Sequence, residues 1–344
     1  MKALQAMKNG PPSEVLEVVD LPVPEPGPDQ VLIKVTAASL NFNDIDRCYG
    51  RRISVPLTPP FTLGMDVCGL VEAVGAGAEA WQGKRVIALT MMATGGLAEY
   101  AIAQSASVFD APPGLTDAEA AAFIIPFQLA YLALVRRAKI AEGETLLVHS
   151  GASSVGAAAI QIGSALGLKV FTTVSSDAKA DYCRKLGADV VINHQTEQFE
   201  QVVLDATDYV GAHVILDLAG GAFVEPSWKC VAREGRYVTA GFADDDENGF
   251  SGRPLRPACA ANFSIMGVML SWVNAVPPAI RDYGFNMFTR DVADEVHSAL
   301  LSLLAQNRVH SVLSRSISLA EAPAALTEQA QRKTLGRTVV IVAN

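Results

Sequence analysis

The chain has 344 residues, half of which are hydrophobic, and its formal net charge is −9 with a pI of about 5.1. This length exceeds what one hydrophobic core ordinarily supports, so we expect two domains. An acidic surface argues against nucleic acid or an anionic membrane as the main partner.

Two features of the sequence favour the cytosol. The N-terminal segment MKALQAMKNG lacks the apolar core of a signal peptide. The most apolar stretch, residues 118–135, is interrupted by Glu119, Pro126 and Gln128 and is shorter than a typical membrane span. We therefore expect a cytoplasmic protein without a membrane partner.

The cysteines form no C-x-x-C pair, and their number is odd. Both features suit reduced thiols rather than a disulfide framework or a four-cysteine zinc site. We expect each cysteine to be a small buried hydrophobic residue. The cysteines stand at positions 48, 68, 183, 230 and 259.

Residues 1 to about 120 are predicted to be rich in β-strands. Short runs of β-forming residues, separated by Pro and Gly, lie at 3–5, 15–19, 31–37, 69–74, 84–89 and 97–103. The proline-dense segment 21–30 is a connector that excludes helix and sheet pairing. A polar corner, Asn41 to Asp46, follows the third run, and Thr116 or Asp117 is the expected N-cap of a later helix.

The stretch from Thr145 to Val174 has the pattern of a βαβ unit of about thirty residues. An apolar run at 146–148 is short enough to be a buried parallel strand. A turn of small residues follows, and then a segment with apolar residues at helical spacing that ends at Gly167. The β-branched run from Val170 to Val174 is the predicted second strand.

The turn of this unit carries a dinucleotide-binding fingerprint. Gly151, Ser153 and Gly156 occupy the three positions of a G-x-G-x-x-G motif between a strand and a helix. Such a turn lets backbone N–H groups approach a pyrophosphate, which also faces the positive end of the helix. Serine at the second position adds a Cβ and makes the match imperfect. The alternative is a turn of small residues that serves only helix–strand packing.

After residue 120, helices and β runs alternate, which predicts a doubly wound parallel sheet. A helix at 178–186 ends at Gly187, and further strands are expected at 190–192, 213–218, 235–240 and 263–270. The charged segment 244–257 is a predicted loop at the carboxyl edge of the sheet, where ligands bind in this fold class. The tail from Asp291 contains two helices and two strands, at 312–317 and 338–342. We therefore divide the chain into domains at 1–120 and 121–272, with a C-terminal return to the first domain at 273–344.

Several motifs, in this order, resemble the zinc-free quinone oxidoreductases of the medium-chain dehydrogenase/reductase superfamily. They are SLNFND, PFTLGMDVCGLVEAVG, VHSGASSVG, LGADVVINH, LDLAGG, GRYVTAGFA and LGRTVVIV. The resemblance implies a GroES-like catalytic domain beside a Rossmann domain. It also implies NADPH as hydride donor, a quinone or α,β-unsaturated carbonyl as acceptor, and a homodimer paired through residues 263–270.

Zinc-dependent relatives carry a G-H-E element and a cysteine in the first domain. Here the G-H-E slot is Gly64-Met65-Asp66, and the cysteine slot falls in residues 40–43, LNFN. A catalytic zinc needs three protein ligands, and only Asp66 remains as a candidate. We therefore predict no metal site.

The end of the second strand bears on the choice between NADPH and NADH. The acidic residue that binds a ribose 2′-hydroxyl is replaced by Ser175 and Ser176, with Lys179 just beyond, and this set suits a 2′-phosphate. Asp177 is either the displaced acid or a helix N-cap. Lys179 has the alternative role of a solvated helix residue.

The resemblance implies further cofactor ligands. His194 and Arg332 would join the shell around the 2′-phosphate, although His194 is equally a surface residue at a strand end. Gly241 and Phe242 would border the nicotinamide, or else form a simple turn. Ser154 and Val155 complete the predicted pyrophosphate turn.

Asn41 and Tyr49 are the candidate catalytic residues. By resemblance, Asn41 is the polar group beside the nicotinamide and the substrate carbonyl; its alternative role is to close a strand corner. Tyr49 has a hydroxyl that is able to donate to an enolate. Relatives with a tyrosine here place it where this chain has Asp46 or Arg52, so Tyr49 is also a candidate core or rim residue.

The leading hypothesis is a zinc-independent NADPH-dependent reductase of quinones, enones or enals. An alternative is an enoyl-thioester reductase, for which Arg51, Arg52 and Arg253 are candidate ligands of the CoA phosphates. A third hypothesis is a protein that binds NADPH and does no chemistry.

Overall fold

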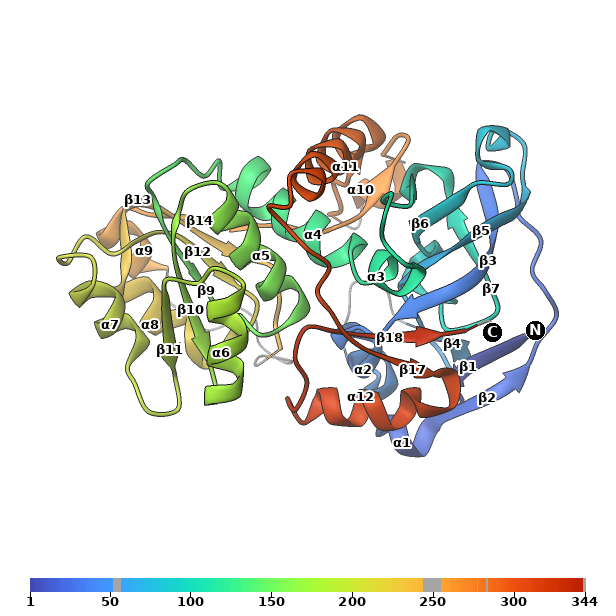
Figure 1. Ribbon diagram of the computed structural model, residues 1–344, viewed down its shortest axis with the longest axis horizontal. Coiled ribbons are helices and arrows are strands. Elements are labelled where there is room, and N and C mark those ends of the chain that lie inside the picture. The colour runs from blue at the N-terminus through green and yellow to red at the C-terminus, as the bar shows by residue number, and fades with distance from the viewer. Residues whose placement is uncertain (52–56, 244–254, 277, 283, 343–344) are drawn as a thin grey trace. The chain divides into compact units, whose positions relative to one another are not determined.

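The computed structural model describes residues 1–51, 57–243, 255–276, 278–282 and 284–342. The chain forms two compact units (Figure 1). The β-rich unit comprises Met1–Ile125, Ser271–Ser298 and Ser311–Asn344, and the parallel-sheet unit comprises Pro126–Leu270 and Ala299–His310. Arg52, Arg253 and most of the predicted loop at 244–257 lie outside the described residues.

Two sheets form the β-rich unit. The smaller sheet has the order β2-β1-β4, and the larger has the order β17-β18-β3-β5-β6-β8, with β7 also paired to β3. The strands are β1 Lys2–Ala6, β2 Leu16–Asp20, β3 Gln30–Ser39, β4 Phe61–Thr62, β5 Asp66–Val74, β6 Arg85–Leu89, β7 Tyr100–Gln104, β8 Val108–Asp110, β17 Leu313–Ser318 and β18 Arg337–Ile341. The predicted strands of this region are therefore confirmed, and the first and last strands of the chain belong to one unit.

The β-rich unit also contains helices. They are α1 Pro12–Val15, α2 Phe42–Tyr49, α3 Asp117–Ala121, α10 Pro278–Asp282 and α12 Ala322–Ala330, with a small pair of strands, β15 Trp272–Val273 and β16 Phe288–Thr289. Helix α3 packs on the larger sheet, and α12 packs against α1 and α2. Side chains from both sheets and from α12, among them Leu4, Ile33, Val67 and Leu326, share one buried apolar core. Burial of this core is the main stabilising contribution within the unit.

The parallel-sheet unit has the predicted doubly wound topology. Its strands run in the order β11-β10-β9-β12-β13-β14, and every pairing is parallel. The strands are β9 Thr145–Val148, β10 Lys169–Val174, β11 Val190–Asn193, β12 Ala212–Asp217, β13 Val231–Thr239 and β14 Ser264–Gly267. The last strand covers only the middle of the expected run at 263–270.

Helices cover both faces of this parallel sheet. They are α5 Ser154–Ala165, α6 Asp177–Lys185, α7 Phe199–Asp205, α8 Val224–Lys229 and α9 Arg256–Ala261. Leu146 faces Gly163 of α5, whereas the next residue, Leu147, joins a core with α7 and α8. Because successive side chains of a strand point to opposite faces, an uninterrupted apolar run is the expected sequence of a strand buried on both sides.

Two long helical segments continue from one unit into the other. One is α11, Arg290–Ala305; the other combines α3, α4 Ile124–Tyr131 and a π-helix at Leu132–Arg137. The segment Asp117–Arg137 is long and apolar enough to cross a membrane, but 72% of its most apolar window is buried within the fold, as in a core helix. Thr116 accepts a hydrogen bond from the Glu119 N–H and is the N-cap, which settles one of the two predicted alternatives.

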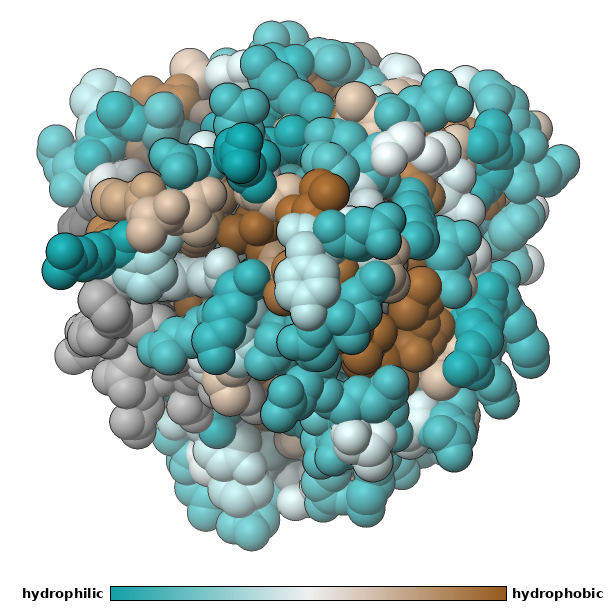
Figure 2. Space-filling view, turned by 90° about the vertical axis from the view of Figure 1, so that its left-hand side faces the viewer, coloured by the Kyte–Doolittle hydropathy of each residue, from teal (hydrophilic) through white to brown (hydrophobic). Residues whose placement is uncertain are grey.

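Two predictions about local structure were wrong. The polar corner at Asn41 to Asp46 is the start of α2, because Asp44 accepts the N–H of Asn41 and stabilises the first helical turn. Four cysteines are buried free thiols as expected, but Cys259, on the surface of α9, is exposed. On the face of the molecule drawn in Figure 2, hydrophilic residues predominate and hydrophobic residues form separate areas.

Candidate functional site

The glycine-rich turn joins β9 to α5 at the carboxyl edge of the parallel sheet. A Cβ added to Gly151 would lie 1.9 Å from Thr172 Oγ1, and one added to Gly156 would lie 2.3 Å from the Ser150 carbonyl oxygen. No larger residue fits either position, because atoms of these kinds cannot approach so closely. Both glycines therefore allow the close backbone packing that the fingerprint requires.

Ser153, at the second fingerprint position, caps helix α5. Its hydroxyl oxygen accepts the Gly156 N–H at 3.1 Å. Ser154 and Val155 are the first two residues of the helix, and the Val155 N–H has no acceptor among the described residues. The turn thus presents a backbone donor and the positive end of a helix, a combination that suits a phosphate group.

The end of the next strand, β10, carries the residues predicted to meet a 2′-phosphate. Lys179 Nζ donates to Ser175 Oγ at 3.0 Å, and the Ser176 hydroxyl accepts the Lys179 N–H. Ser176 is therefore the N-cap of α6, and the prediction that Asp177 caps this helix was wrong. Asp177 is the exposed first residue of α6.

His194 follows β11, the strand beside β10. Its half-buried ring packs edge-on against Phe223, with the ring centroids 5.0 Å apart. Strands β9, β10 and β11 are parallel neighbours, so the glycine-rich turn, Ser175 and His194 follow one another along a single sheet edge. Ligands bind at this edge in doubly wound folds.

The remaining cofactor candidates lie elsewhere. Gly241 follows β13, and a Cβ there would lie 2.6 Å from the Leu218 carbonyl oxygen. The backbone after β13 therefore packs closely on the end of β12. Phe242 beside it is 51% exposed. Arg332 belongs to the β-rich unit, where it follows α12 with a left-handed backbone (φ 59°), and its role toward the nucleotide stays a prediction.

The polar contacts beneath the end of β12 were not predicted from the sequence. Asp217 is completely buried, accepts the Ala219 and Gly220 N–H groups at 2.8 Å each, and also accepts the Tyr237 hydroxyl. The carboxylate therefore fixes the backbone of the loop that follows β12. The motif LDLAGG contains this residue, but the pattern did not assign it a role.

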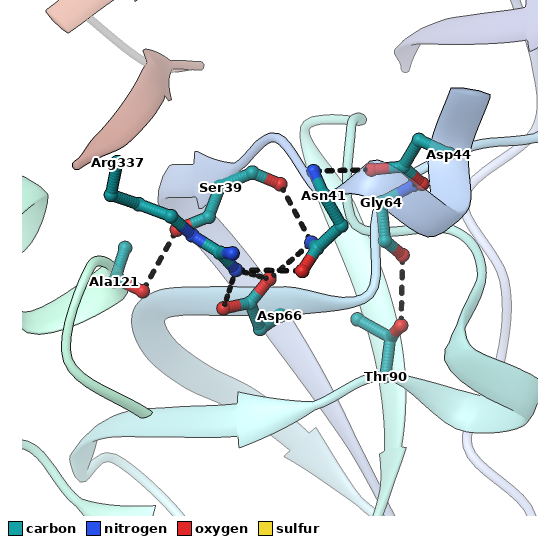
Figure 3. Close-up of polar contacts among 8 residues, drawn as sticks. All are labelled: Ser39, Asn41, Asp44, Gly64, Asp66, Thr90, Ala121 and Arg337. Atoms are coloured by element: carbon teal, nitrogen blue, oxygen red, sulfur yellow. Dashed lines mark hydrogen bonds and ion pairs between the residues drawn. The ribbon is translucent and has the colours of Figure 1, made fainter. Parts of the chain in front are cut away.

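In the β-rich unit, Asn41, Asp66 and Arg337 form a buried polar cluster (Figure 3). Arg337 Nη2 lies 2.8 Å from Asp66 Oδ2 and 2.8 Å from Asn41 Oδ1, and Asn41 Nδ2 donates to Asp66 Oδ1 at 2.8 Å. Strand β3 is antiparallel to both β18 and β5, so its end lies beside their starts. This topology brings together residues that are far apart in the sequence.

The cluster places a cation against Asp66, the one residue that remained as a candidate zinc ligand in the sequence. Asp66 is completely buried, and both of its oxygens lie within 3.0 Å of Arg337 Nη2. Burial raises the pKa of Asp66, and the guanidinium and the Asn41 amide act against that rise. Throughout the part of the chain that the structure describes, no three His, Cys, Asp or Glu side chains form a group suited to a metal ion. Arg337 itself was not identified from the sequence, although the motif LGRTVVIV contains it.

The amide of Asn41 is fully engaged in this cluster. Its two N–H donors point to Asp66 and, at 3.3 Å, to the Ser39 carbonyl oxygen, and the side chain is 5% exposed. An amide group has only two such donors. Donation to a substrate oxyanion would therefore require Asn41 to give up one of these bonds, and the longer one to Ser39 is the weaker.

Tyr49 lies at the other end of α2 from Asn41, about 12 Å away along the helix axis. It is 39% exposed, and the Arg51 guanidinium lies 4.8 Å from the centre of its ring. Within the same helix, buried Arg47 donates to the carbonyl oxygens of Met92 and Ala93, and so holds the loop after β6. The structure thus does not bring Tyr49 and Asn41 together.

Comparisons with known proteins agree with this architecture. The model of the alcohol dehydrogenase GroES-like domain matches residues 27–113, and that of the zinc-binding dehydrogenase family matches residues 154–283, a range that does not include Asp66. Quinone oxidoreductase of Pseudomonas aeruginosa is 30% identical over 99% of both chains. The human quinone oxidoreductase is 33% identical over 78% of this chain and 80% of its own.

The fold also matches solved structures. A mycobacterial protein solved in complex with NADPH superimposes with a TM-score of 0.85 and 27% identity, over 99% of each chain. Together with the two units and the parallel sheet, these matches identify an NAD(P)-dependent oxidoreductase. The chain belongs to the quinone oxidoreductase-like proteins of the medium-chain dehydrogenase/reductase superfamily.

Proposed function

We propose that this enzyme uses NADPH to reduce a quinone or an α,β-unsaturated carbonyl compound, without a metal ion. The observation that carries the choice of NADPH is the pair of Ser175 and Lys179 at the end of β10. A cation and hydroxyl donors suit a 2′-phosphate, whereas an NAD site has a carboxylate at this place.

The residues present fit such a cofactor. The Val155 N–H and the start of α5 suit the pyrophosphate, because the two glycines of the turn leave no side chain in its way. Ser176 and His194 complete the 2′-phosphate shell on the parallel-sheet unit, and Arg332 is a further predicted ligand. Gly241 and Phe242 are the predicted neighbours of the nicotinamide. When bound, NADPH supplies the hydride.

Asn41 is the predicted catalytic residue of the β-rich unit. Hydride addition to a conjugated carbonyl or a quinone leaves negative charge on oxygen, which a preorganised N–H donor stabilises. Asn41 Nδ2 becomes such a donor when it exchanges the 3.3 Å bond to Ser39 for the substrate oxygen. Arg337 and Asp66 keep the amide in place during that exchange, because they hold its oxygen and its other hydrogen. Tyr49 remains a weaker candidate because of its distance from Asn41.

The oligomeric state and the cellular compartment of the enzyme are part of the same proposal. We infer a cytosolic homodimer that pairs through β14, which is one of the two edge strands of the parallel sheet among the described strands. An unpaired edge strand is a ready template for pairing with a second copy. The measured mass in solution, by light scattering, tests this pairing.

The direct test measures NADPH oxidation with a panel of quinones, enones and enals, and with crotonyl-CoA as a separate arm. We expect turnover with at least one quinone, enone or enal, and slower turnover with NADH. Turnover of crotonyl-CoA alone would replace this proposal with an enoyl-thioester reductase. Tight binding of NADPH with no turnover in either arm would instead support a binding protein without chemistry.

A further inference from the structure

We propose that His149 is a positioning residue, which fixes the glycine-rich turn through a chain of hydrogen bonds that all run in one direction. The inference rests on the proposed function, because the turn is the predicted pyrophosphate site. His149 is the last residue before the turn and is completely buried, so it touches no ligand itself.

Four contacts make up the chain, which we call the His149 relay. The Ser150 N–H donates to Thr173 Oγ1 at 3.3 Å, and that oxygen lies 3.1 Å from His149 Nδ1. On its other side, His149 Nε2 lies 2.7 Å from Ser227 Oγ, and the Ser227 hydroxyl lies 2.6 Å from the Phe223 carbonyl oxygen. The relay therefore joins the turn to β10 and to helix α8.

The direction of each bond follows by elimination from the Phe223 end. A carbonyl oxygen only accepts, so the Ser227 hydroxyl must donate its single hydrogen to Phe223. Ser227 Oγ is then left as an acceptor, which requires the hydrogen of the imidazole to be on Nε2. His149 Nδ1 in turn accepts from the Thr173 hydroxyl. Of the two neutral tautomers of His149, only the Nε2–H form satisfies all four contacts.

The relay acts on a strained part of the turn. Ser150 has a left-handed backbone with φ 58°, which is disfavoured for a residue with a side chain. Thr173 holds this conformation from two sides, because its hydroxyl accepts the Ser150 N–H and its carbonyl oxygen accepts the Gly151 N–H at 3.1 Å. The Ser150 carbonyl oxygen in turn lies against Gly156, where α5 begins.

The surroundings keep the imidazole neutral and in place. Its ring packs against Phe199 at 4.8 Å and Phe223 at 5.0 Å between centroids. Burial lowers the pKa of His149 to about 4; the charge of Asp217 opposes this effect and that of His194 adds to it. Phe223 also contacts His194, so the relay connects the turn with the predicted 2′-phosphate shell.

Substitution of Thr173 tests the relay. Thr173→Val keeps the shape but removes the hydroxyl, whereas Thr173→Ser keeps the hydroxyl. We expect Thr173→Val to raise the NADPH dissociation constant about tenfold, the effect of one lost hydrogen bond, and Thr173→Ser to stay close to the wild type. The dissociation constant of NADH should rise by the same factor, because the turn is the predicted site of the pyrophosphate, which both cofactors contain. The kcat at saturating NADPH should change less than twofold.

A matched control separates positioning from general destabilisation. Thr207 also bridges backbone groups in the parallel-sheet unit, donating to the Val203 carbonyl oxygen at 2.7 Å and accepting the Gly211 N–H at 2.9 Å. It precedes β12, at the opposite edge of the sheet from the turn. Thr207→Val should lower the melting temperature as Thr173→Val does but leave NADPH binding unchanged. Equal binding by wild type and Thr173→Val overturns the relay, whereas a wild type that binds no NADPH overturns the proposed function as well.

A spectroscopic measurement tests the tautomer independently of binding. The chain has five histidines, so nitrogen-15 labelling of histidine gives few ring signals to assign. We expect His149 to show the Nε2–H tautomer at neutral pH. An Nδ1–H tautomer or an imidazolium at this position would contradict the relay.

Discussion

The β-rich unit and the parallel-sheet unit hold their buried polar side chains in different ways. In the β-rich unit, Asn41 and Arg337 are 296 positions apart in the sequence, and they meet with Asp66 in a cluster that contains the Arg337–Asp66 ion pair. In the parallel-sheet unit, His149 and its partners are neutral, and the glycine-rich turn lies within one βαβ segment. A local pattern thus specifies the predicted nucleotide edge, whereas only the sheet topology assembles the cluster around Asp66.

Mutation of the cluster around Asp66 should lower the free energy of unfolding by more than a change in the His149 relay does. Arg337→Met leaves the Asp66 carboxylate buried without its counter-ion, and we expect a loss of about 3–5 kcal/mol in the free energy of unfolding. The double variant Asp66→Asn, Arg337→Met removes both charges and should recover most of that loss. Urea unfolding of the wild type and of the two variants measures both effects. If Arg337→Met alone is as stable as the double variant, the ion pair does not have the role assigned to it.

The neutral relay should respond to pH instead. The pKa of His149 is lowered from 6.5 in the unfolded chain to about 4 in the native state, so between these values only the unfolded chain takes up the proton. The contribution of His149 to the free energy of unfolding is therefore fully present above pH 6.5. It decreases by about 3 kcal/mol in total as the pH falls toward 4.

His149→Gln provides the comparison for this pH dependence, since glutamine does not titrate. The raised pKa values of buried Asp44 and Asp66 give a slope of opposite sign, but that slope is common to both proteins and cancels in the difference. The free energy of unfolding should change more steeply with pH in the wild type than in His149→Gln across this pH range. The same pH dependence in both proteins would mean that His149 is protonated or exposed in the native state.

The smallest expected effect concerns cofactor choice. Lys179→Ala removes the cation paired with Ser175 and should weaken NADPH binding about tenfold, while NADH binding stays unchanged. Lys185→Ala, at the exposed end of the same helix, is the matched control and should leave both constants alone. Equal losses for both cofactors would remove Lys179 from the 2′-phosphate shell.

The contrast between the units also explains which features could be predicted from the sequence. The parallel sheet followed from apolar runs and glycine stops within short windows, and its parallel pairing is confirmed. The capping roles of Ser153 and Ser176 did not follow, because a serine before a helix has the same pattern whether it caps the helix or meets a phosphate.

Contacts of long range were beyond any local pattern. Arg337 begins the last strand, and nothing near it in the sequence indicates that its side chain pairs with Asp66. The His149 relay likewise depends on which strands and helices pack together, since Ser227 lies 78 positions further along the chain. The exposure of Cys259 depends in the same way on the packing of α9.

The most direct test of a metal-free NADPH reductase combines metal analysis with turnover. We would measure the zinc content of the purified chain by mass spectrometry, and NADPH oxidation with its best acceptor before and after treatment with a chelator. We expect no stoichiometric zinc and no change in turnover, because Arg337 already lies against Asp66. One zinc ion per chain, whose removal abolishes turnover and whose binding requires Asp66, would contradict the proposed function.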